Sequence, residues 1–332
     1  MMMMESHPER RRLRGQRGFG LIELMVAIII GLLVITAAVS VLGLNRQTFR
    51  VTENLSRMQE NSRVAFELMA RDVREAAGNP CGRNLPVANT VVDGENNFWT
   101  RLGTGIRGFE GGEDFTDNNV GNRIGGTMAI ELSSASASDN LTVVSHNPTA
   151  ATLAVNRSDH DFGVGDVLIV CDYRQVAIFQ MTGPSSSSTV QINHDRNVSG
   201  NPFPGNCTKG LGVPVQCTTN GTPYQYGPGS TIARLAGVRW YIGDNGRGGR
   251  SLYRQFNIAA PQEIVEGVND MRLAFIQEGS GNYVAPAAVT DWGRVTSVRI
   301  ELDVESFENV AEGFQPLRRT VEHYVNLRNR VP

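Results

Sequence analysis

The sequence predicts an α+β protein in which one long N-terminal helix leads into a large, antiparallel β-rich head. The first observation is an uncharged run of 21 residues, Leu24 to Leu44, followed by apolar residues at helical spacing as far as residue 77. The second is a series of short segments after residue 79 in which apolar and polar residues alternate. The third is the content of 36 Gly and 14 Pro in 332 residues, which argues against an all-helical chain.

Composition and charge narrow the class of protein. Hydrophobic residues make up 40% and charged residues 19% of the chain, as in globular proteins, and the length allows one large domain or two. The 31 basic and 33 acidic side chains nearly cancel, which leaves a formal net charge of −2. This balance excludes a nucleic-acid binder that depends on bulk charge, so we expect no nucleic-acid partner.

Residues 1–18 form a basic leader with five Arg and two Glu. The apolar run behind it would form a helix about 30 Å long, enough to cross the hydrocarbon core of a membrane. The positive-inside rule then places residues 1–18 in the cytoplasm and the chain after residue 45 on the other side. Taken alone, the pattern also fits an ordinary signal anchor or a cleaved secretory signal peptide, although the run is long for the latter.

Glu23 lies at the start of the apolar stretch, within Gly18-Phe19-Gly20-Leu21-Ile22-Glu23. A carboxylate in or just below the hydrocarbon costs on the order of 3 kcal/mol on insertion scales. A residue kept there at that cost indicates a function, and it needs a positively charged partner.

Arg17-Gly18-Phe19, with Glu23 four residues later, resembles the processing site of type IV prepilins. The resemblance implies that prepilin peptidase cuts between Gly18 and Phe19, that the new Phe19 amine is N-methylated, and that Glu23 acts in assembly as the fifth mature residue. The ammonium of one subunit would neutralise Glu23 of its neighbour in an apolar helical bundle. Four consecutive Met at the start leave the true start codon open.

The helix is expected to continue past the membrane, with residues 19–44 as its membrane or fibre-core half and residues 45–78 as an amphipathic half. The apolar stripe of this second half comprises Val51, Leu55, Met58, Ala65, Phe66, Met69, Val73 and Ala76. Its other face carries acid–base pairs four residues apart, and Gly78 with Asn79-Pro80 is expected to end it. The stripe fits a coiled-coil dimer, but the β-rich segment that follows at once favours packing on the chain's own head.

Residues 79–332 are expected to form this head, beginning with a loop-rich connection over 81–127. Its Asp114, Asp117, Asn118 and Asn119 lack the spacing of an EF-hand, which favours a solvated loop over a calcium site. Segment 243–249 is rich in Gly and reads as a hairpin loop rather than a phosphate loop, because no helix follows it. Strands are predicted at Thr127–Ser133, Leu141–Ser145, Val167–Cys171, Gln175–Thr182, Thr189–Ile192, Thr231–Leu235, Val238–Ile242, Leu252–Phe256, Met271–Gln277, Val295–Val304 and Thr320–Leu327.

Four cysteines are enough for two disulfides if the head lies in an oxidising compartment. Cys207 and Cys217 lie ten residues apart in one Gly/Pro-rich insert, so closing that loop orders little chain. Cys81 follows the end of the helix and Cys171 ends a predicted strand, so a bond between them would hold the helix exit to the sheet. The alternative is a buried thiol at Cys171 and a free one at Cys81.

Catalytic chemistry has little support. His160-Asp161 and His194-Asp195 resemble acid–base dyads, but each lies in a turn-like polar segment, and we expect surface histidines. The sequence contains neither a Gly-x-Ser-x-Gly elbow nor an HExxH motif. A zinc site would require Cys or His ligands at short spacing, but Cys207 and Cys217 lie ten residues apart with no His between them. We therefore predict no enzyme, no catalytic residue, no metal and no cofactor.

Four segments, 63–78, 165–172, 177–182 and 325–330, are similar to the PilW family of minor pilins, which in turn resembles the J-type minor pseudopilins of type II secretion. The resemblance implies a pilin-like fold and a minor pilin anchored in the inner membrane with its head in the periplasm. Its partners would be other minor pilins and a pilus tip adhesin, with which it primes type IV pilus assembly and sits at the fibre tip. The alternatives are a minor pseudopilin of type II secretion and, in another class, a membrane-anchored extracytoplasmic binding domain or enzyme.

Overall fold

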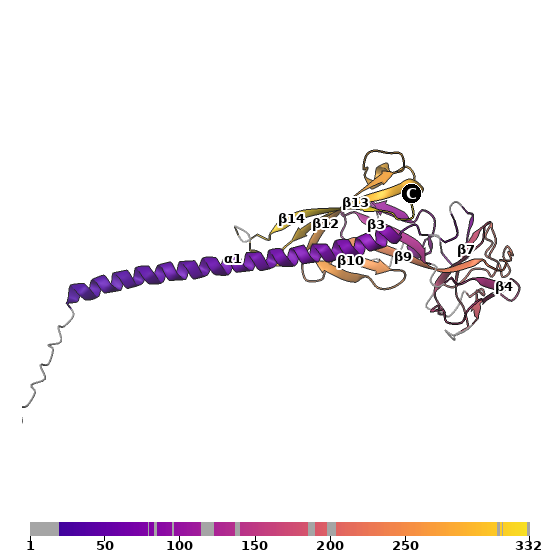
Figure 1. Cartoon of the computed structure of the whole chain (residues 1–332), viewed down its shortest axis with the longest axis horizontal. Helices are drawn as coiled ribbons and strands as arrows, with labels where there is room; N and C mark the ends of the chain where they lie inside the picture. Colours follow the sequence, from indigo (N-terminus) through magenta and orange to yellow (C-terminus); the bar gives the residue numbers. More distant parts are fainter. Residues whose placement is uncertain are drawn as a thin grey trace, which may run out of the picture. The chain divides into compact units, whose positions relative to one another are not determined.

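The computed structural model describes residues 20–78, 80–82, 85–94, 96–113, 123–136, 140–184, 190–197, 204–310, 313 and 315–330. The chain divides into two compact units, residues 1–53 and 54–332. Helix α1, Leu21–Glu75, is continuous over 55 residues and contributes to both units (Figure 1). A long N-terminal helix with a β-rich head confirms the predicted α+β class.

The strands among the described residues of the second unit form three sheets. In the largest, of eight strands, β9 (Thr231–Asp244) pairs with β6 (Val167–Cys171), β3 (Ala129–Ser136) and β10 (Arg250–Phe256). Its other members are β1 (Val87–Asn89), β2 (Ile106–Phe109), β7 (Val176–Gln180) and β11 (Gln262–Glu266). One three-stranded sheet consists of β12 (Val268–Gln277), β13 (Val295–Glu305) and β14 (Arg318–Asn326). The other consists of β4 (Val143–Asn147), β5 (Thr152–Val155) and β8 (Gln191–Asn193). Short 3-10 helices lie at η1 (Phe98–Thr100), η3 (Pro286–Ala288) and η4 (Trp292–Arg294).

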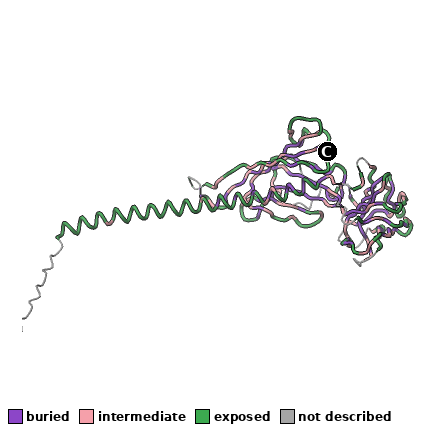
Figure 2. The backbone as a smooth tube through the Cα atoms, viewed as in Figure 1, coloured by how far each residue is buried: buried purple, intermediate pink, exposed green. Residues whose placement is uncertain are grey.

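The end of α1 packs into the largest core of the head. Met58, Ala65, Met69 and Val73 are buried there with Trp240 of β9, among residues of the eight-stranded sheet and of the β12–β13–β14 sheet. Along α1, buried residues occur only in its C-terminal part (Figure 2). The amphipathic stripe therefore packs on the chain's own head, as predicted. A second core fills the space between β6–β7 and the β4–β5–β8 sheet.

Three buried positions on α1 are polar, and the sequence pattern did not identify them. Ser62 donates its hydroxyl proton to the Met58 carbonyl, with an Oγ–O distance of 2.7 Å, so its burial leaves the hydroxyl paired. Asn54 accepts a hydrogen bond from the backbone N–H of Glu308 at 3.4 Å. Asp72, the third, is described with the site below. Leu55, predicted as part of the stripe, is exposed instead.

The strand predictions differ from the structure in two respects. Thr231–Leu235 and Val238–Ile242 belong to one strand, β9, because the chain passes through Gly237 without turning. A Cβ at Gly237 would lie 2.4 Å from the Trp99 Cα, so glycine here permits close packing of η1 and does not mark a turn. The short strands β1, β2, β5 and β11 were not predicted, since three to five residues carry too little alternation. Segment 243–249 does connect β9 to β10, as expected.

Candidate functional site

The N-terminal part of α1 is apolar on every side and exposed. Its most apolar 18-residue window has a mean hydropathy of 2.9, and none of that window is buried. Leu21 and Ile22 are 76% and 77% exposed. The helix is therefore long and apolar enough to cross a membrane, and so large an exposed apolar surface requires lipid or partner helices around it. Gly18 and Phe19 lie outside the described residues.

The polar groups of this segment differ sharply in how they are satisfied. Thr36 donates its hydroxyl proton to the Leu32 carbonyl at 2.8 Å, and Ser40 donates to the Thr36 carbonyl at 2.9 Å. Both hydroxyls are thus compatible with an apolar surrounding. Glu23, in the first turn, is the only ionisable side chain between residues 20 and 45, and it is exposed. The N-terminal end of the helix dipole favours its negative charge, but a cation is still needed to balance it in lipid.

Asp72 fixes the other end of α1 to the large sheet. Its carboxylate accepts a hydrogen bond from Trp240 Nε1 at 2.8 Å and two from Arg254, at 2.7 Å from Nε and 3.0 Å from Nη2. Asp72 is only 9% exposed, so these three bonds replace most of its hydration. The sequence feature that would have indicated this anchor is an acidic residue between the apolar positions Met69 and Val73.

The end of α1 is capped by the C-terminal segment. The prediction placed the helix end at Gly78, but α1 stops at Glu75 and the left-handed residue is Ala77, with φ of 58°. The side-chain amide of Asn329 donates to the carbonyls of Glu75 and Ala76 at 3.4 and 3.3 Å. The Ala77 N–H donates to the Ser133 carbonyl of β3 at 2.8 Å, which explains why a non-glycine residue tolerates this conformation.

Two disulfides join the described cysteines, and they are the two pairs considered from the sequence. Cys81 is bonded to Cys171, with a Cα–Cα distance of 5.6 Å, and so ties the segment after α1 to the end of β6. Cys207 is bonded to Cys217, with a Cα–Cα distance of 4.9 Å, and closes the loop-rich insert. Neither bond leaves a thiol for metal binding or catalysis at these four positions.

The expectation of surface histidines is wrong for three positions. His146, on β4, and His160 and His194, in the segments after β5 and β8, are 4%, 5% and 0% exposed. His146 and His194 are joined by a hydrogen bond of 3.0 Å between their Nε2 atoms. Asp161, the proposed partner of His160, instead accepts a hydrogen bond from Arg234 at 3.1 Å.

The tautomers of the histidine pair follow from their neighbours. The backbone N–H of Tyr226 donates to His146 Nδ1 at 3.1 Å, so the proton of His146 is on Nε2 and is donated to His194. Burial lowers the pKa of His146 to about 4, and burial together with the proximity of His146 lowers the pKa of His194 to about 3. Both rings are therefore neutral at pH 7, and the pair is a structural element of the core rather than an acid–base dyad.

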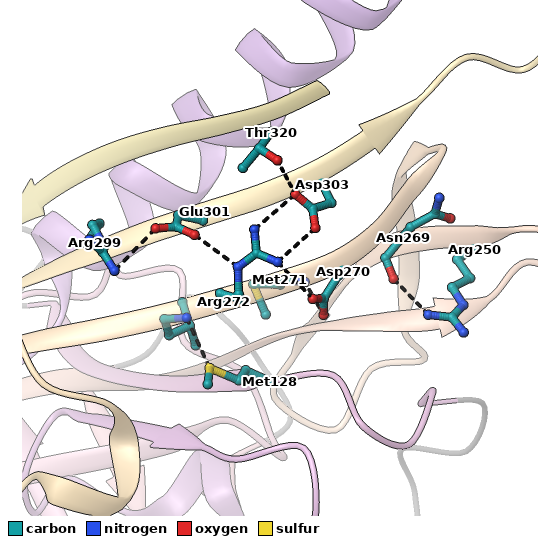
Figure 3. Close-up of polar contacts among 11 residues, drawn as sticks. Met128, Arg250, Asn269, Asp270, Met271, Arg272, Arg299, Glu301, Asp303 and Thr320 are labelled. Atoms are coloured by element: carbon teal, nitrogen blue, oxygen red, sulfur yellow. Dashed lines mark hydrogen bonds and ion pairs between the residues drawn. The ribbon is translucent and has the colours of Figure 1, made fainter. Parts of the chain in front are cut away.

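The outward face of the β12–β13–β14 sheet carries a charged network (Figure 3). Arg272 donates to Glu301 at 3.0 Å and to both oxygens of Asp303 at 2.9 and 3.1 Å, and Thr320 donates to Asp303 at 2.6 Å. Arg299 also contacts Glu301 at 3.2 Å. The side chains are partly exposed, so this network gives the sheet a solvated face and little stability.

A wide groove of about 670 Å³ lies beside β2 and η1, with Phe98, Ile106 and Trp292 in its lining. Its carboxylate, Glu131, is 7% exposed and already bonded by Arg239, with Arg101 at 3.6 Å. The Glu131 carboxylate is therefore already paired inside the head. Among the described residues, no group of three or more His, Cys, Asp or Glu could hold a metal ion.

Comparison with known proteins identifies one region. A family model described as the prokaryotic N-terminal methylation motif matches residues 13–39, a range that includes Gly18, Phe19 and Glu23. No curated protein and no solved structure matches the chain.

Proposed function

We propose that this chain, whose N-terminal methylation motif indicates a type IV pilin or pseudopilin, is a minor pilin of the type IV pilus and a member of the PilW family. It would assemble with other minor pilins, prime pilus assembly and sit at the fibre tip with a tip adhesin. The observation that carries the proposal is the continuation of the motif into an apolar helix that is exposed on every side and holds the single charge of Glu23.

Processing would prepare the helix for assembly. Prepilin peptidase hydrolyses the peptide bond between Gly18 and Phe19, which removes residues 1–18 and frees the Phe19 amine for methylation. A methylated amine remains protonated, so it balances the Glu23 carboxylate of an adjacent subunit once water is excluded. Residues 19–44 then serve first as the membrane anchor and later as the fibre core.

The motif and the apolar helix support anchoring in the inner membrane. The Arg-rich leader favours a cytoplasmic N-terminus, and the two disulfides favour a head in the oxidising periplasm. We propose a role in assembly and no catalysis, because His146 and His194 are bonded to each other and Asp161 is bonded to Arg234.

The proposal is tested by locating the protein in cells. An epitope-tagged chain at native expression is expected in sheared pili, labelled at fibre ends, and its deletion should reduce the number of pili. Tagged protein purified from membranes should bring down other minor pilins. If pili persist in the deletion strain while secretion of exported enzymes is lost, the chain is a minor pseudopilin instead.

A further inference from the structure

The β12–β13–β14 sheet has two edges, and the edge at β12 is protected. Its outward backbone groups are bonded by loops and side chains: the Leu273 N–H contacts Met128 Sδ at 3.1 Å, and Phe275 exchanges two bonds of 2.8 Å with Val284. Further along, Arg250 donates to the Asn269 carbonyl at 3.0 Å (Figure 3). No further strand could pair here without displacing these contacts.

The edge at β14 is open. At the two ends of its ladder with β13, the Leu327 N–H donates to the Thr296 carbonyl and the Ser306 N–H donates to the Leu317 carbonyl, both at 2.9 Å. Odd-numbered residues of β14 therefore bond to β13, and the even-numbered ones direct their N–H and C=O groups away from it. Within the described part of the chain, the outward backbone groups of Thr320, Glu322, Tyr324 and Asn326 have no partner.

β14 carries the charged residues Arg318, Arg319 and Glu322, but it lacks the proline and the bulge that block pairing along an edge. It is nine residues long, contains no proline, and keeps one register with β13 from end to end. Its outward residues are exposed, including Tyr324 at 51%. An edge of this length is suited to receive another strand.

A mainly apolar groove of about 410 Å³ runs beside this edge. It is lined by Leu55, Met58 and Phe66 of α1 and by Arg319, Val321 and Glu322 of β14. Phe66 also packs against His323 of β14, with 5.3 Å between ring centroids. A strand added to β14 would direct alternate side chains toward this groove and the others toward solvent.

We propose that the β14 edge binds an extended segment of a different polypeptide, which adds a fourth strand to the sheet. The segment would carry apolar side chains on the groove side and one carboxylate opposite Arg319. Arg319 is exposed and has no ion pair among the described residues, whereas Arg63 is bound by Glu60 and Glu67. The inference does not depend on the proposed function.

A second copy of this chain does not fit as the occupant. The residues of its own β14 that share a sheet face with Arg319 are Val321, His323 and Val325, and none is acidic. In any register, therefore, pairing of β14 with β14 would leave Arg319 without a carboxylate on that side. Like charges would also oppose each other wherever Glu322 meets Glu322.

The test uses the full chain in detergent and a fluorescent nine-residue peptide that alternates Val and Thr, with Asp in place of one terminal Val. Anisotropy measures its binding to the wild type, to Glu322→Pro and to Glu322→Ala. Proline removes the outward N–H and adds a ring without breaking a bond to β13, so affinity should fall by about tenfold or more, whereas alanine should leave affinity unchanged. Arg319→Gln should weaken the Asp peptide and not an all-Val/Thr peptide.

Three results would overturn the inference. The first is no binding of the peptide to the wild type, and the second is equal affinity for Glu322→Pro and Glu322→Ala. The third is self-association of the wild type in sedimentation that Glu322→Pro abolishes, which would identify a second copy as the occupant. Unchanged melting temperatures of both Glu322 variants ensure that the comparison reports on the edge.

Discussion

Glu23 and the histidine pair show that the role of an ionisable residue in an apolar surrounding depends on where its partner lies. Glu23 is the only ionisable residue between positions 20 and 45 of an exposed apolar helix, and we propose that its partner lies on another subunit. His146 and His194 satisfy each other within the core, so their effect is on stability. On this proposal, the cost of placing a polar group in an apolar surrounding is offset between molecules for Glu23 and within the head for the histidines.

Replacing Glu23 should separate processing from assembly. Glu23→Gln keeps the side-chain size and removes the charge, so cleavage after Gly18 should be normal while the amount of protein in sheared pili falls by about tenfold or more. Immunoblots of membrane and fibre fractions measure both. Glu67→Gln, on the exposed face of α1, is the matched control. Wild-type fibre content in the Glu23 variant would contradict the assigned role.

The histidine pair should make the head sensitive to acid. Folding lowers the pKa of His146 to about 4 and that of His194 to about 3, below the unfolded value near 6.5. The unfolded state then takes up protons first, so stability is full above pH 6.5 and is lost as pH falls toward 4, by on the order of 3 kcal/mol per histidine. Thermal unfolding from pH 7 to 4 should show this loss. A His323→Gln variant should keep the same slope, whereas His194→Gln should reduce it.

At the scale of elements, α1 and the large sheet are held together by few but specific contacts. Asp72 joins α1 to β9 and β10 through Trp240 and Arg254, and Asn329 caps the end of the helix. The disulfide Cys81–Cys171 adds a covalent link between the helix exit and β6. Apolar packing positions the helix, and these contacts fix its register.

Asp72→Ala should destabilise the head by about 3 kcal/mol, because it leaves the Trp240 N–H without an acceptor and Arg254 without its carboxylate. Denaturant unfolding of the detergent-solubilised chain measures the change. Glu67→Ala, on the exposed face of the same helix, should shift stability by less than about 0.5 kcal/mol. Equal effects of the two substitutions would show that Asp72 is not an anchor.

The disulfides should differ in their contributions. Opening the 90-residue loop between Cys81 and Cys171 should cost about 4.5 kcal/mol, against roughly 3 kcal/mol for the ten-residue loop between Cys207 and Cys217, on the chain-entropy estimate. Pairwise replacement by Ser, followed by unfolding measurements, ranks them. Non-reducing peptide mapping of the wild type should find no alkylatable thiol, and four free thiols would refute both bonds.

Local patterns predicted the elements with strong periodicity and missed interactions that join distant residues. The long helix, the run Val167–Cys171 and the hairpin at 243–249 follow from apolar spacing and turn chemistry, and all are present. The buried state of His194 and the salt bridge of Asp72 depend on residues 48 and 182 positions away, so no local window contains them. Two strands were predicted where β9 is continuous, because the close contact of Gly237 with Trp99 involves a residue distant in sequence.

At the scale of the whole molecule, maturation should change both length and charge. Cleavage after Gly18 leaves 332 − 18 = 314 residues, and removing five Arg and two Glu changes the net charge from −2 to −2 − 3 = −5. Intact-mass measurement of protein from cells with prepilin peptidase should give a chain that begins at N-methylated Phe19. Cells without the peptidase supply the uncleaved control. A mature start beyond residue 40 would rule out this processing.

The position of β9 determines how the head would carry mechanical tension. A pull on the end of α1 is transmitted to Trp240 of β9 through Asp72, and to Cys171 of β6 through the bond from Cys81. β6 and β9 are antiparallel neighbours, paired from Leu168–Arg234 to Cys171–Thr231. Force that enters both strands is thus shared between a covalent route and a hydrogen-bonded one within the same sheet. If α1 slipped from the core, the disulfide would pass tension from Cys81 directly to Cys171, so the chain between these two residues would not be extended.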